Sequence, residues 1–523
     1  MARGAIQAFY QRFCEPRLQR FENPVAAQER CLRNILKRCK NTVFGRRYGF
    51  SDIKSVKDFQ RRVPVTTYER MQPYISRCAN GEQNVLFPDR VIIFLATSGT
   101  AGTSKYFPLG EYRIREFLRD SIIGAAFYIV QSGNYEIIDG AVLTIAAAQK
   151  LGQKIGEYDA AHFSGAIPNA LRSPQMQIPQ IKVSSRRVPP PEVDEIDDWE
   201  EKAYLTARYS VAADVRSSSG VTSKVVSQLL RTKRQYLDRL LKDPKLDEKT
   251  KVRLREASSD GDIDLKEIWP NFIVFGAGGV SLTPYRRMIH DLLGDVDIWE
   301  SYGATEASMG LQIWRDKGII AMVDRTFFEF IEEDKVETEP IPLSDVKRNT
   351  LYRVLITNSA GFYRYELGDL VSFSNLDPPV FDQICRKNAL VDVVQERMSE
   401  EVFLRVLTRA CEQFEIGFVD FALLPEVTEE GSRHILFIEF TELPSDLEEF
   451  TSVVDHRLGM AHHMYFKRRK HNHLSRPVII PVQPGGFEQM LRHLGKDPVQ
   501  GKVPRLLTLK LSQMIPQLKS SPS

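Results

Sequence analysis

A loop rich in glycine and hydroxyl side chains, TSGTAGTSK at residues 97–105, carries the first chemical signal in the sequence. Its glycines allow the backbone to turn sharply and present N–H groups, its hydroxyls add donors, and Lys105 adds a point charge. The loop directly follows an apolar run of strand type at residues 91–95, and it does not satisfy the Walker pattern. This composition predicts a loop that grips a triphosphate; the alternative is a polar surface turn between a strand and a helix. The candidate phosphate ligands are Thr97, Ser98, Gly99, Thr100, Gly102 and Lys105.

Three more segments carry polar residues in suggestive patterns: YGATE at residues 302–306, YRYELGD at 363–369 and GKVPR at 501–505. Each also has a plain structural interpretation. The first could be an acidic helix cap after a glycine turn, and the second a hairpin turn with a solvated aspartate. The third could be a basic loop near a chain end. The order and separation of all four segments therefore carry more information than any one of them.

Taken together, the four segments resemble the motifs of the adenylate-forming enzymes, the superfamily of acyl-CoA synthetases, peptide-synthetase adenylation domains and luciferases. The loop is similar to T-S-G-T-T-G-x-P-K, with Ala101 in place of the second threonine and Ser104 where proline is usual. Neither change removes the lysine or the glycines. The other three segments are similar to Y-G-x-T-E, Y-R-x-G-D and G-K-[VIL]-x-R, in the order of the superfamily.

The resemblance implies a role for each candidate residue. Thr305 would contact a nucleotide phosphate and Glu306 would help to hold Mg²⁺, for which one carboxylate suffices because the ion keeps water as its other ligands. Asp369 would accept hydrogen bonds from the ribose hydroxyls, which suits an acceptor-only carboxylate. Lys502 would reach the site from a mobile small domain during adenylation and act with Lys105 in catalysis. Further nucleotide contacts implied by the resemblance are Gly278, Gly279, Tyr302, Gly303 and, at the hinge between the domains, Arg386.

Several details resemble one branch, the GH3 family of acyl-acid amido synthetases. They are TVFGRRYGF at residues 42–50, the DF and VP pairs at 58–59 and 63–64, YRYELGD at 363–369, RKNALVD at 386–392 and QGKVPR at 500–505. The resemblance implies that ATP and a carboxylic acid form an acyl adenylate and pyrophosphate, and that an amine, expected to be an amino acid, then displaces AMP. It leaves the acid and the amine unnamed. One alternative is an acyl-CoA ligase or an adenylating enzyme that loads a carrier protein. Another is a non-catalytic sensor of nucleotide or acid.

Alternating strand and helix patterns predict an α/β fold that positions these residues. The resemblance implies a large multi-sheet domain of adenylate-forming type over residues 1–383 and a small mobile α/β domain over residues 384–523. Expected strands are 91–95, 272–275, 296–299, 351–357, 418–424, 434–440 and 478–482, with a strand or a short buried helix at 141–148. Expected helices are 111–131, 224–241, 284–293, 400–413 and 445–469.

The composition is that of an ordinary large globular protein, with 523 residues, 71 basic and 68 acidic side chains and a formal charge of +3. This length predicts two or more domains, and the near balance of charge gives no case for a nucleic-acid partner. The six cysteines show neither Cys-x-x-Cys nor zinc-finger spacing, so buried reduced thiols are expected. No signal-peptide pattern or membrane-length apolar run is evident, so we expect a cytoplasmic protein without a membrane partner. We also expect a monomer.

Overall fold

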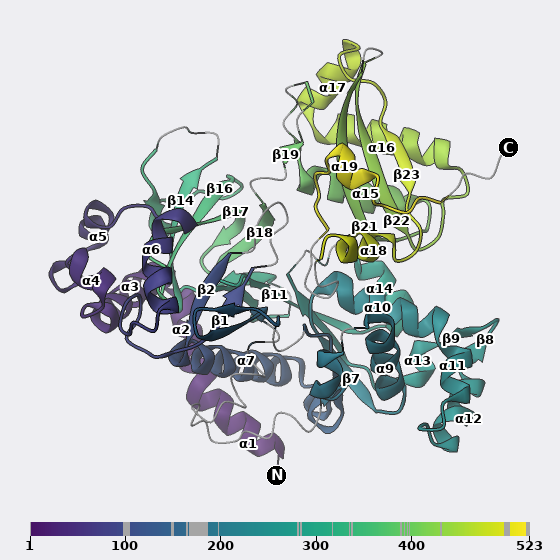
Figure 1. Ribbon diagram of the computed structural model, residues 1–523, viewed down its shortest axis with the longest axis horizontal. Coiled ribbons are helices and arrows are strands. Elements are labelled where there is room, and N and C mark those ends of the chain that lie inside the picture. The colour runs from purple at the N-terminus through teal and green to yellow at the C-terminus, as the bar shows by residue number, and fades with distance from the viewer. Residues whose placement is uncertain are drawn as a thin grey trace.

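The computed structural model describes the chain apart from residues 1, 98–104, 148–150, 164–165, 167–186, 197, 280–281, 283–284, 316, 334, 336–337, 387–389, 392, 395, 397, 429–430, 496–502 and 519–523. The described residues form a large N-terminal region of several sheets and a smaller C-terminal α/β domain (Figure 1). This arrangement confirms the α/β class that the sequence predicts.

The largest sheet of the described chain has twelve strands, and it is parallel in one part and antiparallel in the other. On one side of β11 the neighbouring strands run parallel, and on the other side they run antiparallel. The carboxyl ends of the parallel strands therefore share one edge, which is where α/β sheets commonly bind ligands. In spatial order the strands are β15 (Ile341–Pro342), β14 (Thr326–Glu332), β16 (Tyr352–Asn358), β17 (Tyr365–Leu376), β18 (Pro379–Arg386), β13 (Ile319–Ala321), β12 (Ser308–Gln312), β11 (Asp297–Gly303), β10 (Val274–Gly278), β7 (Val215–Ser219), β3 (Ala141–Thr144) and β6 (Arg187–Val188).

A second sheet presents the predicted phosphate loop. Its strands are β2 (Tyr106–Gly110), β1 (Val91–Ala96), β5 (Tyr158–Ala161) and β4 (Lys154–Ile155), in that order. β1 and β2 flank the loop in the sequence and pair antiparallel, while α7 (Glu111–Ser132) runs on directly from β2 and lies beneath these two strands in Figure 1. α7 ends at Gly133, whose φ of 77° is the left-handed cap conformation that glycine adopts without strain.

Helices cover the large region on several sides, and their apolar faces bury two hydrophobic cores. The expected helix at 224–241 is two helices, with a break at Tyr236. None of the described helices combines the length and apolarity needed to cross a membrane. The remaining helices of this region are α1 (Ala2–Phe9), α2 (Glu15–Glu22), α3 (Pro24–Cys39), α4 (Val43–Arg47), α5 (Val56–Arg62), α6 (Tyr68–Ala79), α9 (Trp199–Val211), α10 (Thr222–Gln235), α11 (Leu237–Lys242), α12 (Glu248–Glu256), α13 (Leu265–Ile268) and α14 (Arg286–Leu293).

The C-terminal domain is a three-stranded sheet with apolar clusters on both faces. The helix expected over 445–469 is two helices, because the backbone at His462 is extended and its ring caps the second helix at Tyr465 N, 3.4 Å away. Its elements are α15 (Glu400–Gln413), β21 (Phe418–Thr428), β22 (Gly431–Phe440), α16 (Leu447–Ala461), α17 (His463–Lys470), β23 (Val478–Pro481), α18 (Gly486–His493) and α19 (Leu509–Ser512).

The described cysteines are buried thiols, as the sequence predicts. Each cysteine whose side chain is described is buried and takes part in no disulfide. Burial raises the pKa of the Cys39 thiol to about 11 and that of Cys78 to about 12, so both stay protonated and unreactive near neutral pH.

Candidate functional site

The glycine run at residues 276–279 lies within and just after β10, at the carboxyl edge of the parallel strands. A Cβ at Gly278 would lie 2.6 Å from Ser301 O, and one at Gly276 would lie 2.8 Å from Ser218 O. Gly279 has a φ of 86°, which favours glycine. The sequence predicts a strand only to residue 275, but β10 runs on to Gly278 because these glycines let three parallel strands approach closely.

β11 likewise extends further than the sequence predicts, and it places Tyr302 and Gly303 inside the strand. The register pairs Gly278 of β10 with Ser301 of β11. Tyr302 therefore lies one residue beyond the end of β10, at the carboxyl edge formed by residues 276–279, which we call the glycine edge. Tyr302 is buried and meets the ring of Phe381 edge-on, at 5.4 Å between centroids. These contacts bring the glycine run and the YGATE motif to one edge of the sheet.

A hydrogen bond joins the YGATE and YRYELGD motifs. The Tyr302 hydroxyl donates to Asp369 Oδ2 at 2.6 Å, and the two residues are 7% and 6% exposed. This distance is typical of a charge-assisted O–H···O⁻ bond, which is stronger than a neutral one. On the adjacent strand Arg386 is the backbone partner of Asp369, although the Arg386 side chain is outside the described part of the chain. The tyrosine therefore orients the carboxylate for which the motif resemblance implies a role in ribose binding.

Glu306 lies on a tight turn after β11. Ala304 N donates to Ala307 O at 2.9 Å, and the return bond from Ala307 N to Ala304 O is 3.3 Å. Asn358 Nδ2 donates to Glu306 O at 3.0 Å and ties this turn to the end of β16. Glu306 is 8% exposed, whereas Thr305 beside it is partly exposed. The turn thus has a fixed backbone with a carboxylate and a hydroxyl on consecutive residues.

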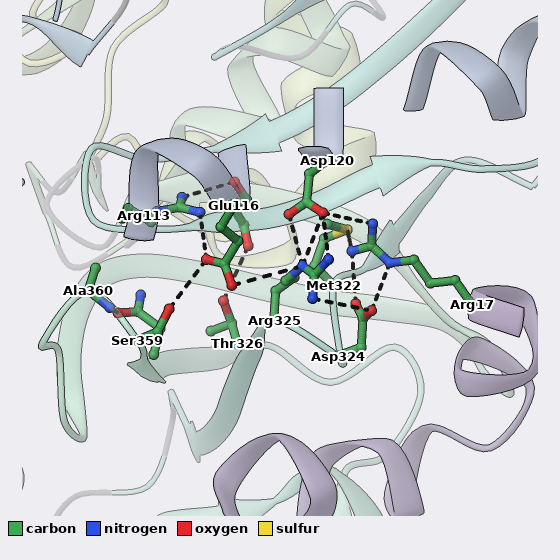
Figure 2. Close-up of polar contacts among 12 residues, drawn as sticks. Arg17, Arg113, Glu116, Asp120, Met322, Asp324, Arg325, Thr326, Ser359 and Ala360 are labelled. Atoms are coloured by element: carbon green, nitrogen blue, oxygen red, sulfur yellow. Dashed lines mark hydrogen bonds and ion pairs between the residues drawn. The ribbon is translucent and has the colours of Figure 1, made fainter. Parts of the chain in front are cut away.

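A buried network of ion pairs supports the strand that follows this turn (Figure 2). Arg113 of α7 donates to Ser308 Oγ at 3.0 Å and pairs with Glu116 at 3.2 Å. Ser359, next to Asn358, donates to Glu116 at 3.3 Å. Burial raises the pKa of Glu116, against the opposing effect of Arg113. The network therefore links α7 to the strand that follows the Glu306 turn and to the residue after Asn358, which holds that turn.

The same network continues from α7 to the N-terminal helices. Arg17 of α2 bonds Asp120 at 2.8 Å and Asp324 at 2.7 Å, and Arg325 bonds Asp120 at 2.9 Å. Burial opposes ionisation of Asp324, but Arg17 and Arg325 hold its pKa at about 2. None of the residues of this network was predicted from the sequence to be functional. The only local signal is that the charged residues at 113, 116 and 120 recur at helical spacing, and other charged residues in the first half of α7 obscure it.

The phosphate-loop candidates are described only at the neck of the loop. Thr97 N donates to Lys105 O at 2.9 Å, and Lys105 N donates to Thr97 Oγ1 at 3.2 Å. Lys105 is exposed, and its Nζ lies 5.4 Å from the centre of the Tyr68 ring. The other loop candidates and the small-domain lysine lie outside the described residues; they are Ser98, Gly99, Thr100, Gly102 and Lys502.

Arg505, three residues after Lys502 in the chain, is fixed within the small domain. It pairs with Asp420 and Glu400, donates to Phe421 O at 2.6 Å and lies over the Phe421 ring. Leu423 N donates to Arg505 O at 2.6 Å, which attaches this segment to β21. Arg505 was not among the predicted site residues, and its position indicates that the arginine of the GKVPR segment is an anchor.

Comparisons with known proteins cover most of the chain. The GH3 family N-terminal domain matches residues 18–245, the GH3 family central domain matches 319–386, and the GH3 family C-terminal domain matches 401–510. A jasmonoyl–L-amino acid synthetase, JAR4, of Nicotiana attenuata is 22% identical over 91% of this chain and 90% of its own length. An indole-3-acetic acid-amido synthetase, GH3.10, of Arabidopsis thaliana is 24% identical over 91% of each chain.

Solved structures show the same fold. GH3.15 acyl acid amido synthetase superposes with a TM-score of 0.79 over 96% of each chain, at 19% identity. A 2-hydroxyisobutyryl-CoA ligase in the postadenylation state superposes with a TM-score of 0.58 over 95% of this chain and 92% of its own, at 13% identity. At these identities the superpositions establish the fold alone, and it is shared with an adenylate-forming ligase.

Proposed function

We propose that this chain, which belongs to the GH3 family of acyl acid amido synthetases, activates a carboxylic acid with ATP and joins it to an amino acid. The observation that carries the proposal is the bond from the Tyr302 hydroxyl to Asp369, at the carboxyl edge of the parallel strands. It brings two motifs of an adenylating enzyme together beside the glycine edge of β10. The family match supplies the acceptor class, because the relatives named above are amino acid or amido synthetases.

The chemistry has two steps. A carboxylate is a poor acyl donor, because its leaving group would be oxide. A carboxylate oxygen of the acid therefore attacks the α-phosphate of ATP, the bond to the β-phosphate breaks, and pyrophosphate leaves an acyl adenylate behind. The amine of the amino acid then attacks the acyl carbon, loses a proton, and displaces AMP. Both steps need orientation and neutralised charge rather than a covalent protein nucleophile.

Asp369 is proposed to bind the ribose hydroxyls, with its orientation fixed by Tyr302. Thr97, Lys105 and the hydroxyls of the loop between them are proposed to bind phosphate, and Lys502 to stabilise charge on the acid and the α-phosphate. Glu306 is a suitable Mg²⁺ ligand, since it sits on a turn tied down by Asn358. Among the described residues, no group of three or more His, Cys, Asp or Glu side chains is arranged to hold a metal ion. When bound, Mg²⁺ neutralises phosphate charge.

The division into residues 1–383 and 384–523 is part of this proposal. Separate hydrophobic cores support two parts, but β18 continues in the large sheet to Arg386, slightly beyond the proposed boundary. Further proposed nucleotide contacts are Gly278, Gly279, Gly303, Thr305 and Arg386. A cytoplasmic location and a monomeric state stay predictions from the sequence.

Exchange of labelled pyrophosphate into ATP, measured against a panel of carboxylic acids, tests the first step. One acid should support exchange, and AMP release with that acid should then require an amino acid. If AMP release requires CoA instead, the acyl-CoA ligase alternative is correct. If the folded protein binds ATP but no acid supports exchange, the sensor alternative is favoured. Full exchange by a Lys502→Ala variant would contradict the role of Lys502.

A further inference from the structure

The small domain contacts the large region through a carboxylate that is almost completely buried. Glu488 of α18 is 5% exposed and accepts hydrogen bonds from residues of α9 and α10. Figure 1 shows α18 at the boundary between the two parts, next to α10 and α14. The donors to Glu488 are Arg231 Nη2 at 2.6 Å, Ser227 Oγ at 2.8 Å and Trp199 Nε1 at 3.2 Å.

The electrostatics of this contact favour a charged Glu488. Burial opposes ionisation, but Arg231 and Lys224 together lower the pKa of Glu488 below its usual value. Arg231 is also held by Glu200, with bonds of 2.9 and 3.1 Å to its two carboxylate oxygens. Bonds to a buried charge from three separate side chains restrict both the position and the rotation of α18. The contact therefore defines one placement of α18 on the large region.

α10, which carries two of the partners of Glu488, begins beside the glycine edge of β10, where the nucleotide is proposed to bind. Val221 forms a parallel bridge to Gly278, and Gly278 N donates to Gly220 O at 3.2 Å. In the first turn of α10, Thr222 Oγ1 donates to Gly278 O at 3.3 Å. A continuous helix thus connects the glycine edge of β10 to Arg231 and, through it, to Glu488.

On the other side of the contact, α18 leads toward the lysine of the GKVPR motif. The helix ends at His493, and the chain is described again from Val503, which is buried. Two residues later Arg505 is fixed to β21 as set out above. In the sequence, Lys502 therefore falls between a helix that is attached to the large region and a segment that is attached to the small-domain sheet.

We propose that Glu488 is a positioning residue that sets Lys502 relative to the nucleotide edge. This rests on the proposed role of Lys502 in adenylation. Glu488 touches neither ATP nor the acid; it aligns the two parts of the protein that carry the catalytic groups. The proposed ATP ligands Asp369 and Glu306 belong to the large region, so loss of Glu488 should slow the reaction while leaving ATP binding intact.

The test is pyrophosphate exchange by the full-length Glu488→Gln variant, with an acid that the wild type accepts. Glutamine keeps the shape and removes the charge. We expect kcat to fall by about tenfold or more, since small misplacement of a catalytic group has effects of this size, while KM for ATP stays within about twofold. Glu449→Gln on α16 is the matched control, because Glu449 is an exposed glutamate of the same domain, and it should behave as wild type.

A double variant separates positioning from general damage. In a Lys502→Ala background, Glu488→Gln should cause no further loss of kcat, because the group that it positions is already absent. An equal loss in both backgrounds, a rise in KM alone, or wild-type exchange by Glu488→Gln would overturn the inference. If Lys502→Ala itself exchanges at the wild-type rate, the role proposed for Lys502 fails instead, and the two failures are distinguishable.

Milder variants cover the case in which Glu488→Gln does not fold. Ser227→Ala and Trp199→Phe each remove one donor to Glu488 from the large region and leave the small domain unaltered. Each should lower kcat in the same direction by a smaller factor, with an unfolding temperature close to that of the wild type. Unchanged kcat in both variants would also overturn the inference.

Discussion

The ion pair between Arg364 and Glu329 supports the segment that carries Asp369, and its removal should be costly. Arg364 is 2% exposed and Glu329 is 1% exposed. Arg364 Nε lies 3.0 and 3.1 Å from the two carboxylate oxygens, and Nη1 donates to Gln60 O at 2.8 Å and Val63 O at 2.7 Å. The arginine of the YRYELGD motif thus points into the protein and joins β14 to the N-terminal helices.

Arg364→Met removes the positive charge and keeps a side chain of similar length. The φ of 48° at this position disfavours methionine and arginine alike, so backbone strain largely cancels in the comparison. Loss of one partner from a buried pair costs about 3–5 kcal/mol, because the remaining charge is uncompensated. With an unfolding entropy of about 2.1 cal/mol/K per residue, and a cooperative unit of about 380 residues, this corresponds to a fall in Tm of roughly 4–6 °C.

Calorimetric unfolding of two variants beside the wild type tests the expected cost of the unpaired charge. Arg364→Met should lose stability at pH 8 and lose less at pH 5, because burial already raises the pKa of Glu329 and the unpaired carboxyl can take up a proton. The double variant Arg364→Met/Glu329→Leu should recover most of the loss, since an apolar pair leaves no buried charge. A Tm for the single variant within about 1 °C of the wild type, or a double variant no more stable than the single, would refute the argument.

Three further predictions concern groups whose environment the structure defines. Tyr302→Phe removes a charge-assisted bond worth about 1.5–3 kcal/mol, so we expect the Kd for ATP, measured by titration calorimetry, to rise by about tenfold or more; an unchanged Kd would contradict the orienting role of Tyr302. Burial raises the pKa of Glu439 from 4.5 to about 7, so its contribution to stability is complete below pH 4.5 and is lost as the pH rises through about 7. Glu439→Gln should accordingly flatten the dependence of Tm on pH between 5 and 8, and an unchanged slope would exclude Glu439 as its source. Asp324→Asn deprives Arg17 of a buried partner and should cost about 3 kcal/mol in thermal unfolding, whereas an unaltered Tm would show that Asp120 alone satisfies this arginine.

The elements beside the motifs could be predicted where local pattern alone determines them. The apolar run at 91–95 is β1, and the helix expected at 111–131 is α7, with Gly133 as its cap. The helix expected at 400–413 is α15, with the same bounds. In each case the periodicity or the end signal lies within the segment itself, so no distant contact is needed to interpret it.

Prediction failed where distant pairing decides the outcome. Glycines disfavour strands, yet β10 continues to Gly278 because its backbone pairs with Ser301 of β11. The local sequence does not reveal that Arg113 and Asp120 of α7 have partners near residues 308 and 325, about two hundred positions away. The residue types proposed for the site come from the resemblance of the motifs and stay predictions. The bond from Tyr302 to Asp369 could not be predicted, because it depends on how β11 and β17 are placed by the strands between them.

Arginine–carboxylate pairs stand at four junctions of the structure. Arg17 joins α2 to α7, Arg364 joins the β16–β17 turn to β14, Arg231 joins α10 to α18, and Arg505 joins the GKVPR segment to β21. A guanidinium stays charged and offers several donors in a fixed plane, so it constrains orientation as well as distance. A well-packed apolar pair can match or exceed a buried ion pair in stability but sets no such orientation. Paired apolar replacement at these junctions should therefore preserve the unfolding temperature while lowering exchange turnover. If stability and turnover instead fell together, the pairs would be serving packing and not alignment.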